Sequence, residues 1–208
     1  MKRLVLLTAL AFLALTAVRA PAFQTIIIDA GHGGHDRGAS PGQALCEKTL
    51  ALDVAQRVAE KLRESGIKAV MTRSNDTFIS LDRRVDIANA HTNALFVSIH
   101  FNSAWRRGAH GFETFYYHPR AEAIAVRVND ELETVRKGED RGAKKRGFYV
   151  LRRSRIPAIL VECGFLTNPQ EAVLCQKASY REELAEAIVR GIKKSMPNAG
   201  ASQTAPAN

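Results

Sequence analysis

The sequence predicts an α/β fold, a single-domain three-layer α/β/α sandwich around a mostly parallel, mixed sheet. Short apolar segments alternate along the chain with longer segments of helical pattern. Strands that alternate with helices favour parallel pairing, with helices covering both faces of the sheet. The segment after Gly111 follows the preceding strand without an intervening helix. We therefore expect some antiparallel pairing within this sheet.

The first half of the chain supplies three predicted strands and two predicted helices. Three consecutive isoleucines predict a buried strand over Thr25–Asp29, because a short run of β-branched residues is typical of one. A helical pattern follows over Lys48–Ser65. The other elements of this half are strand Lys68–Met71, helix Leu81–His91 and strand Leu95–His100.

The second half continues the alternation and ends in helices. Its predicted strands are Gly111–Tyr117, Phe148–Leu151 and Ala158–Glu162. Its predicted helices are Pro119–Lys137, a short one near Asn168–Cys175, and Ala178–Lys194. Arg141–Gly142 is interpreted as a turn.

Both ends of the chain depart from this pattern. Residues 1–22 combine a basic start, an apolar run from Leu4 to Val18 and the small-x-small sequence Ala20-Pro21-Ala22, which is typical of a secretory signal peptide. The run is short for a membrane span, so a retained anchor is the less favoured alternative. We expect an exported protein, periplasmic or extracellular at the cell wall. Residues 197–208 are predicted to be a disordered tail.

Three predicted strand ends carry residues suited to metal binding or proton transfer. His32 lies in the glycine-rich turn after the first strand, His100 ends a second, and Glu162 ends a third. Sites in open α/β sheets form beyond the carboxyl ends of strands, so we expect these residues to share one site. Each alone would more often be structural. Glu47 could join them, or could be an acid stabilised by the first turn of a helix.

The order of these motifs resembles one family. The motifs are Gly-His-Gly-Gly-x-Asp-x-Gly-Ala from Gly31, then Glu47, Ser98-Ile-His-Phe-Asn102, and Val161-Glu-Cys-Gly-Phe-Leu-Thr-Asn168. They resemble the zinc-dependent N-acetylmuramoyl-L-alanine amidases of the amidase-3 type, which are bacterial cell-wall autolysins. The resemblance runs from about Thr25 to Lys194.

The resemblance implies a site and a reaction. It assigns His32, Glu47 and His100 as ligands of Zn²⁺ and Glu162 as the catalytic carboxylate. Two imidazoles and one carboxylate leave a fourth position open, as in catalytic zinc sites. Zinc lowers the pKa of bound water from about 15.7 to about 7, and a glutamate can move the proton to the leaving amine.

The implied activity is that of a hydrolase with peptidoglycan as its partner. It would cut the amide between N-acetylmuramic acid and L-alanine of the stem peptide, with residues 23–196 as the catalytic domain. Asn102 and Arg141 are candidate substrate contacts. One alternative is a zinc peptidase that cuts within the stem peptide. Another is a non-catalytic wall-binding protein, which would need none of the four site residues.

Several residues near these motifs allow more than one interpretation. His35 could compete with His32 as a ligand, and a thiolate of Cys46 could bind the metal. Asp29 could support the site or contact substrate, although a cap of the glycine-rich turn is preferred. Cys163 is interpreted as a buried free thiol, since it follows Glu162 on a strand.

The charge of the chain is uneven. The net charge is +9, and Arg136–Arg155 holds nine basic residues against Glu139 and Asp140. This segment could bind carboxylates of the wall polymer, or it could be a solvated basic loop. We expect no nucleic-acid partner, because an exported protein rarely meets nucleic acid and the segment lacks the regular aromatic interleaving of a single-strand binder. We expect no stable membrane anchor after signal cleavage, and a monomer.

Regulation by a plug in the active site is not expected. Some relatives in this family carry an extra helix between the second zinc histidine and the catalytic glutamate, which fills the site. Here 61 residues separate His100 from Glu162, and the predicted elements use nearly all of them. Glu139 is the one acid placed to fold back as a surrogate ligand.

Overall fold

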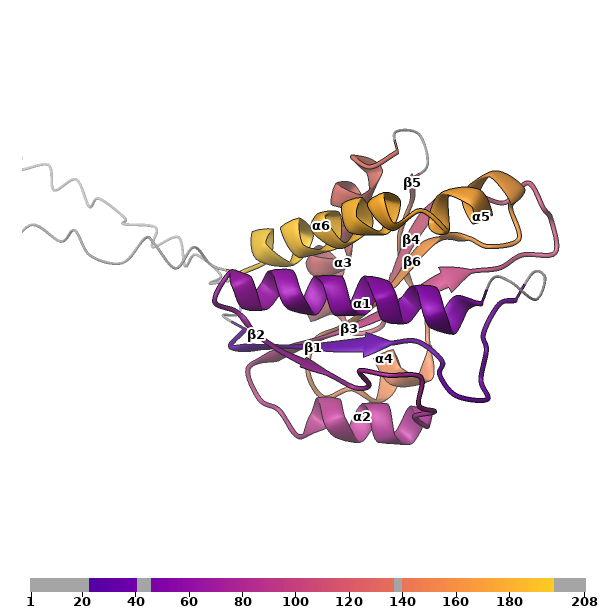
Figure 1. Cartoon of the computed structure of the whole chain (residues 1–208). Helices are drawn as coiled ribbons and strands as arrows, with labels where there is room; N and C mark the ends of the chain where they lie inside the picture. The colour runs from indigo at the N-terminus through magenta and orange to yellow at the C-terminus, as the bar shows by residue number, and fades with distance from the viewer. Residues whose placement is uncertain (1–22, 41–45, 137–139, 197–208) are drawn as a thin grey trace, which may run out of the picture.

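A six-stranded mixed sheet between two layers of helices forms the core of the computed structural model, which describes residues 23–40, 46–136 and 140–196 (Figure 1). The strand order is β2-β1-β3-β6-β4-β5. The three-layer α/β sandwich predicted from the sequence is therefore confirmed.

The elements alternate between strand and helix as the sequence indicates. The strands are β1 (Thr25–Ala30), β2 (Lys68–Met71), β3 (Ala94–Asn102), β4 (Phe112–Tyr116), β5 (Asp140–Lys145) and β6 (Ala158–Phe165). The helices are α1 (Glu47–Glu64), α2 (Leu81–Asn89), the 3₁₀ turn η1 (Pro119–Ala121), α3 (Glu122–Glu133), α4 (Tyr149–Arg153), α5 (Pro169–Cys175) and α6 (Ala178–Lys194).

The pairing of the central strands brings site residues together. β1 is parallel to β2 and β3, and β3 is parallel to β6. In the β3–β6 pair, His100 lies opposite Glu162. β4 is antiparallel to β6, as expected for the strand that arrives without a helix, and there Glu113 lies opposite Glu162.

The two faces of the sheet bury two hydrophobic clusters. Helices α1, α3 and α6 cover one face, and α2 and α4 cover the other (Figure 1). Successive strand residues point to opposite faces, so Ile26 and Ile28 join the larger cluster and Ile27 joins the smaller one. All three are fully buried. Each such side chain stabilises the fold by roughly 1.5–3 kcal/mol.

Two local predictions are wrong. Phe148–Leu151 does not form a strand, because residues Tyr149–Arg153 form the short helix α4. This helix buries Val150 and Leu151 against the smaller cluster. Arg141–Gly142 is not a turn but part of β5, which pairs with β4 at the edge of the sheet.

Other predicted elements differ only at their ends. The helix expected from Pro119 begins as η1, and α3 ends at Glu133. β3 and β6 continue beyond His100 and Glu162, to Asn102 and Phe165. The predicted signal peptide and tail, residues 1–22 and 197–208, lie outside the described residues and stay predictions. In the described ranges, no helix combines the length and apolar character needed to span a membrane.

Candidate metal centre

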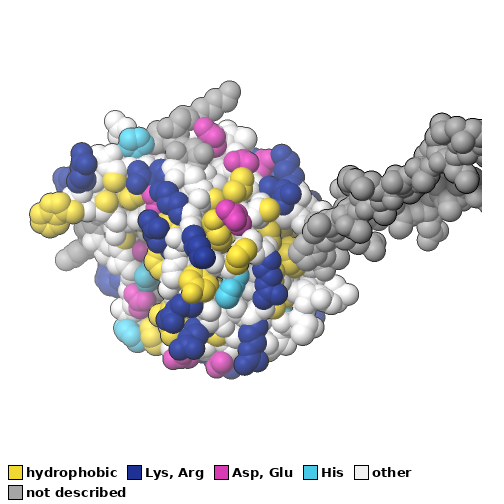
Figure 2. Space-filling model, turned by 180° about the vertical axis from the view of Figure 1, so that it is seen from behind, with side chains coloured by type: hydrophobic (Ala, Val, Ile, Leu, Met, Phe, Trp, Pro, Cys, Tyr) yellow, Lys and Arg dark blue, Asp and Glu magenta, His cyan; other side chains and the backbone are white. Residues whose placement is uncertain are grey.

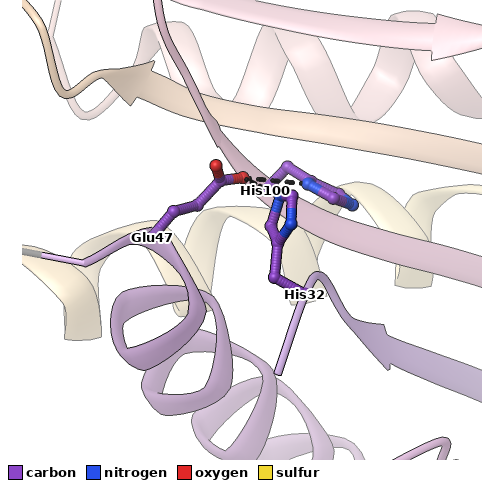
Figure 3. Close-up of side chains that lie close together, drawn as sticks. All are labelled: His32, Glu47 and His100. Carbon is purple, nitrogen blue, oxygen red and sulfur yellow. Dashed lines mark hydrogen bonds and ion pairs between the residues drawn. The ribbon is translucent and has the colours of Figure 1, made fainter. Parts of the chain in front are cut away.

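His32, Glu47 and His100 come together at one edge of the sheet. His32 lies in the loop after β1, Glu47 is the first residue of α1, and His100 lies in β3. Figure 3 shows the three side chains directed toward one another. Glu47 Oε1 lies 3.0 Å from His32 Nε2 and 2.9 Å from His100 Nδ1. One donor atom from each residue lies within 4.8 Å of the other two, which suits a shared metal ion.

Contacts behind His32 set the direction of its ring. Its backbone is left-handed, with φ of 59°, and the Arg84 guanidinium donates to its carbonyl oxygen at 2.6 Å. His32 Nδ1 lies 2.9 Å from Asp36 Oδ2. A proton shared with Asp36 leaves the Nε2 lone pair free for a metal. A carboxylate behind a ligating histidine is the usual arrangement in metal sites.

Glu47 is held on both of its oxygens. Its side chain is buried at the start of α1, where Oε2 accepts from the Ala39 amide at 2.8 Å and Oε1 accepts from the Phe101 amide at 3.1 Å. Two backbone donors therefore fix the orientation of the carboxylate.

The loop between β1 and α1 approaches these side chains so closely that only glycine fits at two positions. A Cβ on Gly31 would overlap the His100 ring. Gly38 has φ of +63°, and a Cβ there would lie 2.5 Å from Glu47 Oε2 and 2.7 Å from His32 Cδ2. The glycines of this loop thus let the backbone close around the candidate ligands.

Electrostatics keep Glu47 ionised. Burial by itself raises the pKa of Glu47, but hydrogen bonds and charge from His100 and His32 outweigh it and leave that pKa far below its usual value. Burial would lower the pKa of His32, yet Glu47 and Asp36 leave it raised. The ionised carboxylate therefore favours a positive charge beside it, either a proton on His32 or a metal ion shared by the three side chains.

Glu162 lies beside this cluster in a different environment. Burial, reinforced by the negative charges of Glu47 and Glu113, holds the pKa of Glu162 well above its usual range. Its Oε2 atom is buried and has no hydrogen-bond partner among the described residues. A buried polar atom without a partner is costly. We therefore interpret this atom as one that meets a ligand.

A cleft of about 360 Å³ joins Glu162 to the three candidate ligands. Two apolar segments line it, one at the start of α2 and one at the start of α4, and neither was predicted to belong to the site. They are Phe78, Ile79 and Leu81, and Phe148, Tyr149 and Val150. Phe78, Leu81 and Phe148 are partly exposed, at 42%, 54% and 41%. The cleft can therefore accept a ligand with both polar and apolar parts.

Of the two predicted substrate contacts, one lines the cleft and the other does not. Asn102 lines it and donates to Glu113 Oε2 at 3.3 Å. Arg141 does not line it, but pairs with Glu113 through Nε and lies over the Phe165 ring at 5.0 Å. Glu113 thus links both residues. The sequence analysis did not single out Glu113, although it predicted the strand that contains this residue.

Asp29 supports the site from inside the core. It is buried and accepts from Thr72 Oγ1 and Ser98 Oγ at 2.7 Å each, and from Arg84 Nη1 at 2.6 Å. Arg84 in turn holds the loop at His32. The preferred interpretation of Asp29 as a cap of the turn is therefore replaced by a buried ion pair.

His35 and Cys46, the two competing candidate ligands, lie outside the group of side chains that could share a metal ion. His35 stacks on Phe78, with ring centroids 4.1 Å apart. The Cys46 thiol donates to the Arg37 carbonyl at 3.2 Å. Cys163 is buried and free, as expected. Glu139, the possible surrogate ligand, lies outside the described residues.

Comparison with known proteins gives consistent matches. The sequence model of a family described as N-acetylmuramoyl-L-alanine amidase matches residues 26–194. The chain is 40% identical to the uncharacterized protein YqiI of Bacillus subtilis, over 81% of this chain and 83% of that protein. It is also 40% identical to the N-acetylmuramoyl-L-alanine amidase LytC of Bacillus subtilis, over 81% of this chain but only 34% of LytC.

One solved structure has the same fold as this chain. The crystal structure of an N-acetylmuramoyl-L-alanine amidase from Clostridium difficile 630 has a TM-score of 0.81 and 38% identity, covering 86% of this chain and 100% of that chain.

Proposed function

Because the chain belongs to the N-acetylmuramoyl-L-alanine amidase family of cell-wall hydrolases, we propose that it uses zinc to cut the amide between N-acetylmuramic acid and L-alanine of the stem peptide. The observation that carries the zinc assignment is the group His32, Glu47 and His100, next to the unpartnered Oε2 of Glu162. We also propose export through the signal peptide at residues 1–22, since the substrate lies outside the cytoplasm.

The donor set fits zinc. Two imidazole nitrogens and one carboxylate oxygen are common ligands of catalytic zinc, and three protein ligands leave a position for water or substrate. Asp36 behind His32 and the backbone amides at Glu47 are the outer contacts that such ligands usually have.

The residues of the chain then share the work of amide hydrolysis. Bound zinc supplies Lewis-acid activation of water and of the amide carbonyl. Glu162 accepts a proton from the attacking water as the new carbon–oxygen bond forms. It returns that proton to the nitrogen as the carbon–nitrogen bond breaks, which yields a lactyl carboxylate and a free amine. The positive charge of a nearby metal favours the ionised form of Glu162 that can take the proton.

Product analysis tests the proposed activity directly. Purified mature protein is incubated with peptidoglycan, and the soluble products are identified by mass spectrometry. We expect intact stem peptides that begin with L-alanine, and glycan strands without peptides. Shortened stem peptides would instead identify a zinc peptidase, and no released product with zinc-loaded protein would favour a wall-binding protein.

Two sets of variants separate metal binding from catalysis. Glu162→Gln keeps the size of the side chain but removes the base. Zinc content should therefore stay as in the wild type, and turnover should fall by about 10²–10⁴-fold. His32→Ala and His100→Ala should lose zinc together with activity. Metal content is measured by mass spectrometry. Full zinc occupancy in the double histidine variant, or a Glu162→Gln rate within about threefold of normal, would contradict these roles.

A further inference from the structure

The loop between β3 and β4 exposes the only tryptophan of the chain. Trp105 is 100% exposed, whereas the other large hydrophobic side chains on the described surface are at most 57% exposed. Hydrophobic burial would favour covering an indole, so a fully exposed one is a candidate contact for a partner. Backbone amides of the loop form hydrogen bonds. The Ala104 amide donates to Thr167 Oγ1 at 3.0 Å, and the Ala109 amide donates to the Arg106 carbonyl at 3.0 Å.

Two arginines follow this tryptophan. Arg106 and Arg107 are exposed, and in the described parts of the chain neither forms a side-chain hydrogen bond or an ion pair. Arginine presents a planar fork of donors that matches a carboxylate. The loop therefore combines a free aromatic face with two free cations.

The loop borders a second hollow, separate from the cleft in its lining residues. The hollow has a volume of about 580 Å³, and its lining includes Trp105, Arg106, Arg141 and Phe165. Ser103 lines the catalytic cleft, and the next residues of the chain line this hollow. A polymer that leaves the cleft along the β3–β4 loop would thus meet the tryptophan and the arginines.

We propose that residues 104–110 bind a glycan strand whose muramic acids carry free lactyl carboxylates. This inference rests on the proposed function, because hydrolysis of the amide leaves one carboxylate on each muramic acid that has lost its peptide. The indole face would stack on the apolar face of a sugar ring, and Arg106 and Arg107 would pair with the carboxylates. The site would therefore hold the product strand next to the cleft and keep the protein on it.

A lipid surface is the other partner that an exposed tryptophan and arginines could contact. The observations favour the glycan, since the loop offers a single large apolar side chain and borders a partly polar hollow beside the cleft. Stable attachment to a bilayer requires a larger apolar face. The experiment includes vesicles so that this partner is tested too.

Tryptophan fluorescence reports on this loop alone, because Trp105 is the only tryptophan. The mature protein is titrated with three probes. They are peptide-free glycan strands prepared with an unrelated amidase, chitin oligosaccharides of equal ring number, and vesicles of anionic phospholipid. Peptide-free strands are not substrates, so binding is measured without turnover. We expect a saturable change in emission with the glycan strands, weaker binding of the uncharged chitin, and no change with vesicles.

Substitutions in the loop test which of its side chains contact the glycan. Arg106→Ser with Arg107→Ser should weaken glycan binding by about three- to tenfold and remove the preference over chitin. Trp105→Ala should lower retention on peptide-stripped sacculi by about three- to tenfold. Its side chain is fully exposed, so the fold should be unaffected. The control, Val126→Ala with Arg127→Ser, removes an exposed apolar group and an exposed cation from α3 and should behave as wild type.

The outcomes separate this inference from the proposed function. Unchanged emission with glycan strands, equal binding by the arginine variant and wild type, or a response to vesicles alone would overturn the glycan site. If stem peptides are still released in that case, the amidase activity stands. If no stem peptide is released by wild type, the proposed function fails whatever the fluorescence shows.

Discussion

Burial separates the three thiols of this protein into two kinds. Cys163 and Cys175 are buried, and Cys46 is half-buried in the loop before α1. Burial raises the pKa of Cys175 to about 12 and that of Cys163 well above its usual value. The thiolate is the reactive form, so a buried thiol with a raised pKa is inert.

We therefore predict that one thiol reacts in the folded protein. An alkylating agent near pH 8 should modify Cys46 and spare Cys163 and Cys175, because both of these stay protonated and shielded. Peptide mass mapping identifies the modified residues, and a denatured sample, in which all three should react, is the control. Rapid modification of Cys163 in the folded protein would contradict the structure.

The candidate site residues were largely predictable from the sequence. His32, Glu47, His100 and Glu162 stand in recognisable motifs at strand or helix ends, and the structure brings them together. Residues that act through them were not predictable. The Asp36 contact depends on the left-handed backbone at His32, and Glu113 reaches the site only because β4 pairs with β6. The first contact arises from the conformation of the loop and the second from strand pairing, and neither leaves a periodic signal in the sequence.

At the scale of elements, the described part of the loop between β1 and α1 packs closely against the candidate ligands. Gly38 and Gly66 both have positive φ, at +63° and +75°. They differ in what a side chain would meet. Nothing lies within 4 Å of a Cβ on Gly66, which follows α1, whereas a Cβ on Gly38 would meet Glu47 and His32.

These two glycines give a matched test of the metal centre. Both Gly38→Ala and Gly66→Ala should lose about 1–2 kcal/mol of stability, because an L-residue is strained in the left-handed region. Only Gly38→Ala should also displace Glu47, and its zinc affinity should fall by at least about tenfold. Thermal unfolding measures stability, and competition with a chelator measures affinity. Equal zinc affinity in the two variants would show that the loop does not position Glu47.

Most elements followed from the local sequence, and the two errors have a common cause. β5 reads Asp-Arg-Gly-Ala-Lys-Lys, which resembles a loop, since an edge strand needs little apolar surface and often carries lysine. α4 contains aromatic and β-branched residues typical of a strand, yet packing of Val150 and Leu151 against the smaller cluster selects a helix. Both depend on neighbours far along the chain. The strands with long apolar runs could be predicted without knowledge of their neighbours in the fold.

For the whole molecule, positive charge is spread over the surface rather than confined to one segment. Figure 2 shows Lys and Arg side chains across much of one face, with fewer acids among them. Part of the basic segment is also neutralised, because Arg141 and Lys144 both pair with Glu113. Lys145 and Arg146 are exposed and lack an acidic partner among the described residues.

This distribution predicts which charges hold the wall polymer. Lys145→Ser with Arg146→Ser should weaken binding to sacculi and leave turnover of a small substrate nearly intact. The difference in sacculus binding between this variant and the wild type should shrink as the salt concentration rises, because exposed charges are screened over about 8–10 Å at physiological ionic strength. Sacculus pull-down at two salt concentrations measures it. The control, Arg127→Ser with Lys177→Ser, removes the same amount of charge from α3 and from the start of α6. An equal loss of sacculus binding in this control would indicate a general charge effect.

The path of the chain between His100 and Glu162 bears on regulation of the whole molecule. This stretch forms β4, η1, α3, β5 and α4, all of which pack on the sheet or beside it. Among the described residues, no helix fills the cleft that contains the candidate ligands. An activator can shift only an equilibrium between states that exist, and the described structure offers no closed state for it to shift.

We therefore predict that the purified mature protein digests the wall unaided. Dye release from labelled sacculi should begin on addition of the zinc-loaded protein, and cell-envelope extract should change the rate by less than about threefold, because no plug has to be displaced. Glu162→Gln with the same extract controls for hydrolases in the extract. Absence of dye release by the protein alone, followed by strong release on adding extract, would mean that another component opens the site and that the cleft seen here is not its resting state.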